Sequence, residues 1–167
     1  MANDAADAPS TGARTRRVVA GVAVIVAADV LTKVWAVSAL SDGPVGVVGD
    51  FVELRLTRNP GGAFGRFQGM TVVLAVAAIA ITFLLVRELR RTTDRVLLFG
   101  LTLVLGGALG NLVDRVFRSP GVLRGHVVDF VSVGEFPVFN IADSCITIGA
   151  IALVLRTLRT PAPVSRS

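Results

Sequence analysis

Four long runs of apolar residues, separated by polar stretches, dominate the sequence. The runs cover residues 18–40, 70–86, 96–113 and 136–155. A helix crosses the hydrocarbon core of a bilayer with about 20 apolar residues, within a range of roughly 17–25, so each run predicts a transmembrane helix. The first run could also be a cleaved signal peptide, but the apolar part of such a peptide has only about 7–15 residues, which favours a span.

The segment between the first two runs has a different pattern. Residues 45–58 are rich in β-branched side chains and alternate in part, most clearly in Phe51-Val-Glu-Leu-Arg-Leu. This predicts one or two short strands outside the hydrocarbon, at the membrane surface. Asn59-Pro60-Gly61-Gly62 predicts a turn, and residues 114–135 are expected to leave the membrane before the fourth span. The pattern thus indicates an all-α membrane protein with four transmembrane helices and a small external β-sheet.

A chain of 167 residues usually forms one domain. Residues 1–13 are small and polar, and we expect them to form a disordered N-terminal tail. Residues 14–159 then form a single four-helix domain, and residues 160–167 a cytoplasmic C-terminal tail.

Composition supports a membrane protein. The hydrophobic fraction is 53%, the charged fraction 17% and the mean hydropathy +0.71, which is too apolar for an ordinary soluble domain. The net charge of +5 and the pI of about 11.2 are also found in nucleic-acid-binding proteins. Here the arginines cluster between apolar runs instead of lining one face, so we expect no nucleic-acid partner and attribute the charge to contact with membrane lipid.

The distribution of arginine predicts the orientation. Ten lie near the two termini and between the second and third spans: Arg14, Arg16, Arg17, Arg87, Arg90, Arg91, Arg95, Arg156, Arg159 and Arg166. Six lie in the two longer connecting segments: Arg55, Arg58, Arg66, Arg115, Arg118 and Arg124. The side with the denser positive charge is cytoplasmic in most membrane proteins, so both termini are expected inside and both longer segments outside.

Polar residues inside the first and third spans are candidates for structure or function. Asp29 and Lys33 are four residues apart and share a helix face. They could form an ion pair that orients the helix, or serve a site, since charge within a membrane is costly; Lys33 could also extend outward to a lipid head group.

The third span presents Gly107, Gly110, Asn111 and Asp114 on one face, at steps of three and four. Small residues allow helices to pack closely, and buried Asn or Asp can bond across the interface. Arg115 could neutralise Asp114, or could hold a substrate carbonyl or a phosphate. In the turn at 59–64, a side-chain amide or the bare backbone of a glycine could bind an extended peptide or a head group.

Two aspartates lie in strongly apolar surroundings. Val127, Val128 and Phe130 flank Asp129, while Asp143 follows Asn140 by three residues in the first turn of the fourth helix. Taken singly, Asp129 could be a loop residue and Asp143 an acid favoured by the helix dipole. Together, at one depth in the bilayer, they could share a proton, which raises one pKa and lowers the other. Such a pair can activate water and protonate an amide leaving group.

Other chemistries have weaker support. His126 is the only histidine, no serine or cysteine has a suggestive base, and zinc would need more ligands than the chain offers. We therefore expect no metal and no cofactor. Two alternatives stay open, namely a non-catalytic scaffold and a proton pathway through Asp29, Asp114, Asp129 and Asp143. A pathway would string its acids across the membrane, whereas three of these four are predicted at the outer ends of spans.

Five blocks of the sequence, in order, resemble the lipoprotein signal peptidases, or signal peptidase II, over residues 18–155. The blocks are Asp29-Val-Leu-Thr-Lys33, Asn59-Pro-Gly-Gly-Ala-Phe64, Gly107-Ala-Leu-Gly-Asn-Leu-Val-Asp-Arg115, Val128-Asp-Phe130 and Phe139-Asn-Ile-Ala-Asp-Ser144. The resemblance implies an intramembrane aspartyl endopeptidase that removes the signal peptide from diacylglyceryl-modified prolipoproteins, on the N-terminal side of the lipidated cysteine.

The resemblance also implies roles for individual residues. Asp129 and Asp143 would be the catalytic dyad. Residues that bind or position substrate and dyad would be Asn59, Gly61, Asn111, Asp114, Arg115 and Asn140, with Asp29, Lys33 and Ala142 in support. The family implies an extracytoplasmic β-sheet cradle, a site near the outer face of the bacterial cytoplasmic membrane, inhibition by globomycin and no metal. We expect the chain to act as a monomer.

Overall fold

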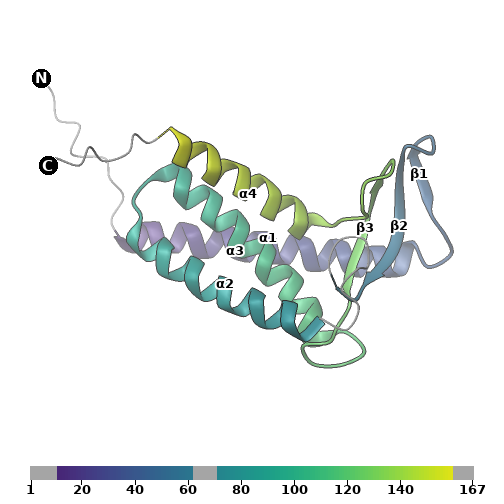
Figure 1. Ribbon diagram of the computed structural model, residues 1–167. Helices are drawn as coiled ribbons and strands as arrows, with labels where there is room; N and C mark the ends of the chain where they lie inside the picture. The colour runs from purple at the N-terminus through teal and green to yellow at the C-terminus, as the bar shows by residue number, and fades with distance from the viewer. Residues whose placement is uncertain (1–10, 62–70, 160–167) are drawn as a thin grey trace, which may run out of the picture.

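The computed structural model describes residues 11–61 and 71–159, which form a helical bundle with a small sheet at one end (Figure 1). The elements in chain order are α1 (Thr11–Ala39), β1 (Val45–Val48), β2 (Val52–Asn59), α2 (Thr71–Arg91), α3 (Arg95–Phe117), β3 (Val127–Val133) and α4 (Ile141–Leu158). All four helices are long and apolar enough to cross a membrane. The predicted fold class is therefore confirmed.

The helix boundaries differ from the predicted spans. α1 begins at Thr11, so residues 11–13, expected in the tail, are helical. α2 and α3 extend past their apolar runs to Arg91 and Phe117. Hydropathy marks the part of a helix that lies in hydrocarbon, whereas the backbone hydrogen bonds continue into the polar interface.

The prediction that the fourth span begins at Phe136 is wrong. α4 begins at Ile141, and Asn140 caps it by accepting a hydrogen bond from the Asp143 backbone N–H. The preceding residue, Phe139, is extended and pairs with Val131 of β3. The apolar run at residues 136–155 therefore contains both Phe139, which pairs with β3, and the start of α4.

The other three helices pack on α3, and its glycines allow the closest approaches. A Cβ atom on Gly107 would lie 2.4 Å from the Ala142 carbonyl oxygen, and one on Gly110 would lie 2.6 Å from Asp29 Oδ2. The predicted packing through small residues is therefore confirmed at both positions. These approaches bring polar groups of α1, α3 and α4 together.

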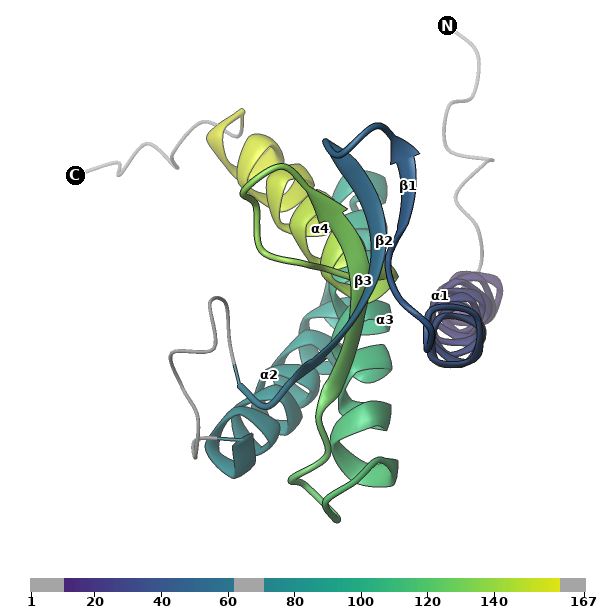
Figure 2. The ribbon, with the colours of Figure 1, turned by 90° about the vertical axis from the view of Figure 1, so that its right-hand side faces the viewer.

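The sheet has the order β1-β2-β3, and both pairs are antiparallel (Figure 2). β1 lies within the predicted strand region, and β2 extends one residue beyond it, to Asn59. Residues 114–135 were expected only to leave the membrane, so β3 was missed. Ala36 and Leu40, at the end of α1, pack with Phe130 of β3 and fix the sheet to the bundle. Thr57 of β2 lies opposite Asp129.

A tight return of the chain after β3 brings the two predicted catalytic segments together. Gly134 takes a φ of +51°, which suits glycine in a turn, and the Phe136 N–H donates to the Val133 carbonyl. The Phe130 N–H then donates to the Phe139 carbonyl at 3.1 Å. Because Asn140 follows directly, the start of α4 lies beside Asp129.

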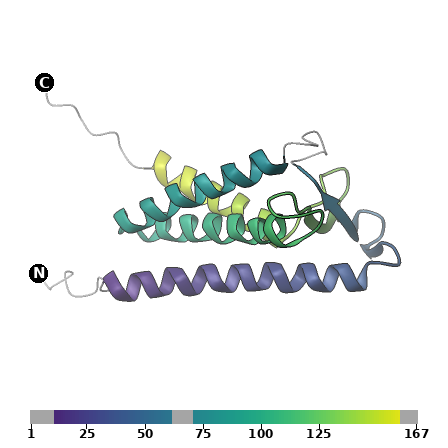
Figure 3. The same cartoon turned by 90° about the horizontal axis from the view of Figure 1, so that it is seen from below.

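The molecule has two distinct ends (Figure 3). The sheet lies at one end, and the start of α1, the connection from α2 to α3 and the end of α4 lie at the other, which is called the helix end below. At the helix end, Asp94 caps α3 and forms an ion pair with Arg156 of α4 at 2.6 Å. Hydrogen bonding to Arg156 lowers the pKa of Asp94.

Candidate active site

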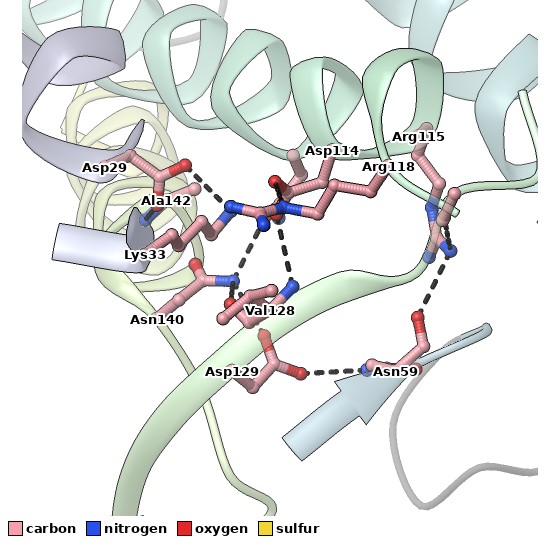
Figure 4. A network of polar contacts seen from close by, with 12 residues as sticks. Asp29, Lys33, Asn59, Asp114, Arg115, Arg118, Val128, Asp129, Asn140 and Ala142 are labelled. Carbon is pink, nitrogen blue, oxygen red and sulfur yellow. Dashed lines mark hydrogen bonds and ion pairs between the residues drawn. The ribbon is translucent and has the colours of Figure 1, made fainter. Parts of the chain in front are cut away.

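Asp129 is held on β3 by amide donors from two other elements (Figure 4). Its side chain is only 2% exposed. Asn140 Nδ2 donates to Asp129 Oδ1 at 2.7 Å, and Asn59 Nδ2, at the end of β2, donates to Oδ2 at 3.1 Å. The strand register carries Asn59 to this position, because residues 57 and 59 pair with residues 129 and 127.

Asp143 lies in the first turn of α4 and completes a capping box with Asn140. The Asp143 N–H donates to Asn140 Oδ1 at 2.9 Å, and the Asn140 N–H donates to Asp143 Oδ2 at 3.3 Å. Asn111 Nδ2 of α3 donates to Asp143 Oδ1 at 2.8 Å. Asn140 therefore contacts both carboxyl groups, that of Asp129 through its side-chain amide and that of Asp143 through its backbone N–H.

The pKa of Asp129 is raised to about 7, first by burial and next by the negative charge of Asp143. The hydrogen bonds from Asn59 and Asn140 oppose this rise, since they favour the charged carboxylate. A carboxyl group with a pKa near 7 can both hold and release a proton at neutral pH.

A buried ion network lies behind the aspartates. Lys33 Nζ contacts Asp29 Oδ2 at 2.7 Å and Asp114 Oδ2 at 2.9 Å, and donates to Asn111 Oδ1 at 2.9 Å. The predicted pairing of Asp29 with Lys33 is confirmed. The alternative in which Lys33 extends to a head group is wrong, because its side chain is fully buried among these partners.

Asp114 links α3 to β3, the strand that carries Asp129. Its Oδ2 accepts a hydrogen bond from the Val128 N–H at 3.1 Å, next to Asp129. Its Oδ1 pairs with Arg118. Sequence reasoning missed the role of Arg118, although its spacing of four residues from Asp114 on a helix is a signal for such a pair.

Asp29 links α1 to the start of α4. Asp29 Oδ1 accepts a hydrogen bond from the Ala142 N–H at 3.0 Å. This N–H is one of the first of α4, which have no partner within their own helix. Ala142 thus contacts α1 through its backbone, and the bond fixes the first turn of α4, which carries Asp143.

Arg115 holds the backbone around the site. Its Nη1 donates to the carbonyls of Asn59, Pro60 and Gly125 at 3.3, 3.0 and 3.1 Å. The ion pairs of Asp114 are made by other residues, so the structure gives no support to direct neutralisation by Arg115. The Gly61 N–H donates to Asn59 Oδ1 at 3.0 Å, as in a turn. The remainder of this predicted block, residues 62–64, lies outside the described residues.

Both aspartates line a cavity of about 1160 Å³. Polar groups of Asn59, Asn111 and Arg115 line it near the aspartates. Most of its other lining is apolar and comes from α2, α3, α4 and the β3–α4 connection, with Thr57, Arg58, Glu135, Ser144 and Thr147 as further polar residues. The apolar residues are Leu74, Ala77, Ala78, Ile81, Val104, Ala108, Leu112, Phe136, Pro137, Val138, Phe139, Ile146 and Ile148. Such a cavity suits a largely apolar ligand that places polar groups near the aspartates.

Among the described residues, no group of three or more His, Cys, Asp or Glu side chains could hold a metal ion. The chemistry that the described groups can perform is proton transfer between carboxyl groups and water.

Asn140→Ser tests the positioning role of the shared amide. Serine also caps helices well, but it lacks the amide donor to Asp129. We expect kcat to fall roughly 10–100-fold, since hydrogen bonds to charged groups contribute about 1.5–3 kcal/mol. Activity that requires protonated Asp129 should persist to higher pH in this variant, because the lost donor lowers the pKa of Asp129. Ser38→Ala, at an exposed position near the end of α1, is the control. An unchanged pH profile in Asn140→Ser would contradict a positioning role for Asn140.

Comparison with known proteins identifies the fold and the family. A family model described as signal peptidase (SPase) II matches residues 21–159. The lipoprotein signal peptidase of Rhodococcus jostii is 56% identical over 142 residues, covering 84% of this chain and 71% of the relative. That of Mycobacterium tuberculosis strain H37Rv is 45% identical over 153 residues, covering 91% and 76%.

Solved structures of bacterial membrane enzymes have the same fold. A structure described as a bacterial membrane enzyme superimposes with a TM-score of 0.77 at 28% identity, covering 89% of this chain and 94% of the other. A second has a TM-score of 0.75 at 30% identity, covering 87% and 94%. With its four membrane helices, its sheet and a family match over most of its length, this chain belongs to the signal peptidase II family.

Proposed function

We propose that Asp129 and Asp143 act together on one water molecule to cut the signal peptide from diacylglyceryl-modified prolipoproteins, just before the lipidated cysteine. Membership of the family makes the chain a peptidase of prolipoprotein signal peptides. The observation that carries the catalytic assignment is the shared Asn140, which contacts both carboxyl groups in one cavity.

The raised pKa of Asp129 supports a division of labour. Asp143, held by hydrogen bonds from Asn111 and the Asn140 N–H, acts as the base that takes a proton from water. The water oxygen then bonds to the scissile carbonyl carbon. Asp129, with its pKa near 7, gives its proton to the amide nitrogen as the C–N bond breaks. The proton on Asp143 returns to Asp129, so the pair is ready for another cycle.

The cavity supports a mode of substrate binding. The apolar walls from α2 and α4 would receive the apolar part of the signal peptide, and the amides near the aspartates would hold its extended backbone. The diacylglyceryl group would stay in the lipid and set which bond reaches the aspartates. Globomycin, the inhibitor expected for the family, would compete for this cavity. We propose that the chain acts as a monomer.

We propose that the aspartates lie near the outer face of the bacterial cytoplasmic membrane. The helix end, which carries the start of α1 and the end of α4, has the denser arginine clusters, and such an end faces the cytoplasm in most membrane proteins. A proton pathway is less well supported than proteolysis, because Asp29, Asp114, Asp129 and Asp143 gather in one network instead of crossing the bundle.

Incubation of the purified protein in detergent with a diacylglyceryl-modified prolipoprotein tests the function. We expect a product that begins at the lipidated cysteine, identified by mass spectrometry, and little cleavage of the unmodified precursor. Globomycin should block the reaction. Equal cleavage of both precursors would contradict selection by the lipid, and proton flux in vesicles without cleavage would favour a pathway.

Activity should depend on pH with an upper limit set by Asp129. Because its pKa is about 7, the proton needed by the leaving group is present below pH 7 and is lost as the pH rises through 7. We expect kcat to fall about tenfold per pH unit well above that point. Initial rates across the pH range, with thermal unfolding as a control for stability, measure this; a constant rate up to pH 9 would contradict the role of Asp129 as the acid.

A further inference from the structure

A second groove lies between α1 and α2, with Leu105 of α3 at its floor. Its volume is about 720 Å³. Arg14 and Arg90 line its polar end, and its apolar walls include Ala23, Ala27, Leu89 and Leu105. None of them lines the catalytic cavity, so the groove is a separate feature that proteolysis does not explain.

The length of the groove matches one leaflet of a membrane. Its wall on α1 runs from Arg14 to Val30, which corresponds to about 24 Å along a helix. A bilayer with its head groups is about 40–45 Å thick, so one leaflet is about 20–22 Å. The groove therefore extends from the head-group level at the helix end of the bundle to the middle of the bilayer.

The apolar part of the groove is kept open by small residues. Ala23 and Ala27 lie four residues apart on α1, both line the groove and both are exposed. Valine side chains and Leu89 form the other walls. An apolar groove lined by small residues and valines can accommodate an alkyl chain.

The polar end of the groove is positively charged. Arg14 of α1 and Arg90 of α2 line it from opposite sides. Within residues 11–61 and 71–159, neither guanidinium forms an ion pair, whereas Arg156 at the same end is paired with Asp94. Two unpaired guanidinium groups at the mouth of an apolar channel complement a phosphate ester attached to an acyl chain.

We propose that this groove binds one anionic phospholipid of the leaflet opposite the catalytic site, with its phosphate between Arg14 and Arg90. Charge disfavours the other occupants. A signal peptide begins with a positively charged segment, which the two arginines would repel, and a second copy of the chain would bring further arginines to them. In the orientation proposed above, this is the cytoplasmic leaflet, whose anionic lipids attract basic groups.

Native mass spectrometry of the purified full chain, with phosphatidylglycerol and phosphatidylcholine added in turn, tests the proposal. We expect a one-to-one complex that prefers phosphatidylglycerol. The affinity should fall about fivefold in Arg14→Gln or Arg90→Gln and about 25-fold in the double variant, at about 1 kcal/mol for each arginine. Arg17→Gln/Arg91→Gln removes the same charge from the same helix ends outside the groove and should bind as the unaltered chain does.

Ala23→Phe/Ala27→Phe tests the acyl channel without altering charge. It should abolish the one-to-one complex and leave prolipoprotein cleavage intact, which also shows that the variant folds. Equal affinity for the two lipids, equal losses in the two double arginine variants, or cross-linking of the groove to a signal peptide or a second chain would overturn the proposal. Lipid binding is measured directly, so its failure is independent of any failure in proteolysis.

Discussion

Replacing either Asp129 or Asp143 with asparagine should lower the rate of prolipoprotein cleavage by about 10²- to 10⁴-fold, the range that general acid–base catalysis contributes. Asparagine has nearly the same shape, and its single carbonyl oxygen can keep one of the two hydrogen bonds that each carboxylate accepts, but it can neither release nor take up the proton. Initial rates with a diacylglyceryl-modified prolipoprotein in detergent measure the effect.

The loss should be confined to the chemical step. Binding of globomycin and the thermal unfolding temperature should change little in both variants, because the packing of the cavity is kept. Asp50→Asn, in the exposed turn between β1 and β2, is the matched control and should cleave normally. Cleavage within tenfold of the original rate in either active-site variant would contradict the dyad.

Among the substitutions considered, Lys33→Met should cause the largest decrease in the free energy of unfolding. The ammonium group is fully buried and contacts two carboxylates and Asn111. Removing one partner of a buried ion pair costs about 3–5 kcal/mol, because the remaining charge is left uncompensated. Asp114 keeps its ion pair with Arg118, so the uncompensated charge is mainly that of Asp29. The free energy of unfolding, measured in detergent micelles as the denaturant concentration is increased, gives the change.

A second substitution separates this explanation from a general packing defect. In Lys33→Met/Asp29→Asn the uncompensated charge is removed, and more than half of the lost stability should return. Arg95→Met, an exposed cation in the first turn of α3, should change stability by less than about 0.5 kcal/mol. A double variant no more stable than Lys33→Met alone would contradict the charge-based explanation.

Much of the fold could be predicted from the sequence because a membrane restricts the choices. A run such as residues 96–113 is long enough to span hydrocarbon and has few other stable states. The polar residues within the spans were informative for the same reason. Asp29 and Lys33 could be paired in advance, since two charges on one helix face in a membrane need each other.

The third strand could not be predicted from its pattern. Val127, Val128, Asp129 and Phe130 are all buried, so the alternation that marks a strand with one exposed face is absent. The partner strand lies about 70 residues earlier, and no local signal specifies that pairing. As a result, the sequence placed both aspartates at one depth but did not reveal Asn140 as their common contact.

The role of Arg115 could not be predicted for the same reason. Its carbonyl partners belong to the end of β2 and to the segment before β3. Their positions follow from the sheet and not from the helix that carries the arginine. Sequence reasoning could place a cation beside Asp114, but it could not tell whether that cation would contact the acid, a substrate or the backbone.

The most direct test of the central claim, that two carboxyl groups face one another across a single site, is the pKa of Asp129 measured by carboxyl ¹³C NMR in the unaltered chain and in Asp143→Asn. In the unaltered chain the pKa should be near 7. In the variant it should be lower, because the charge of Asp143 that raises it is gone. A pKa that is the same in both proteins would show that the two groups do not share a site.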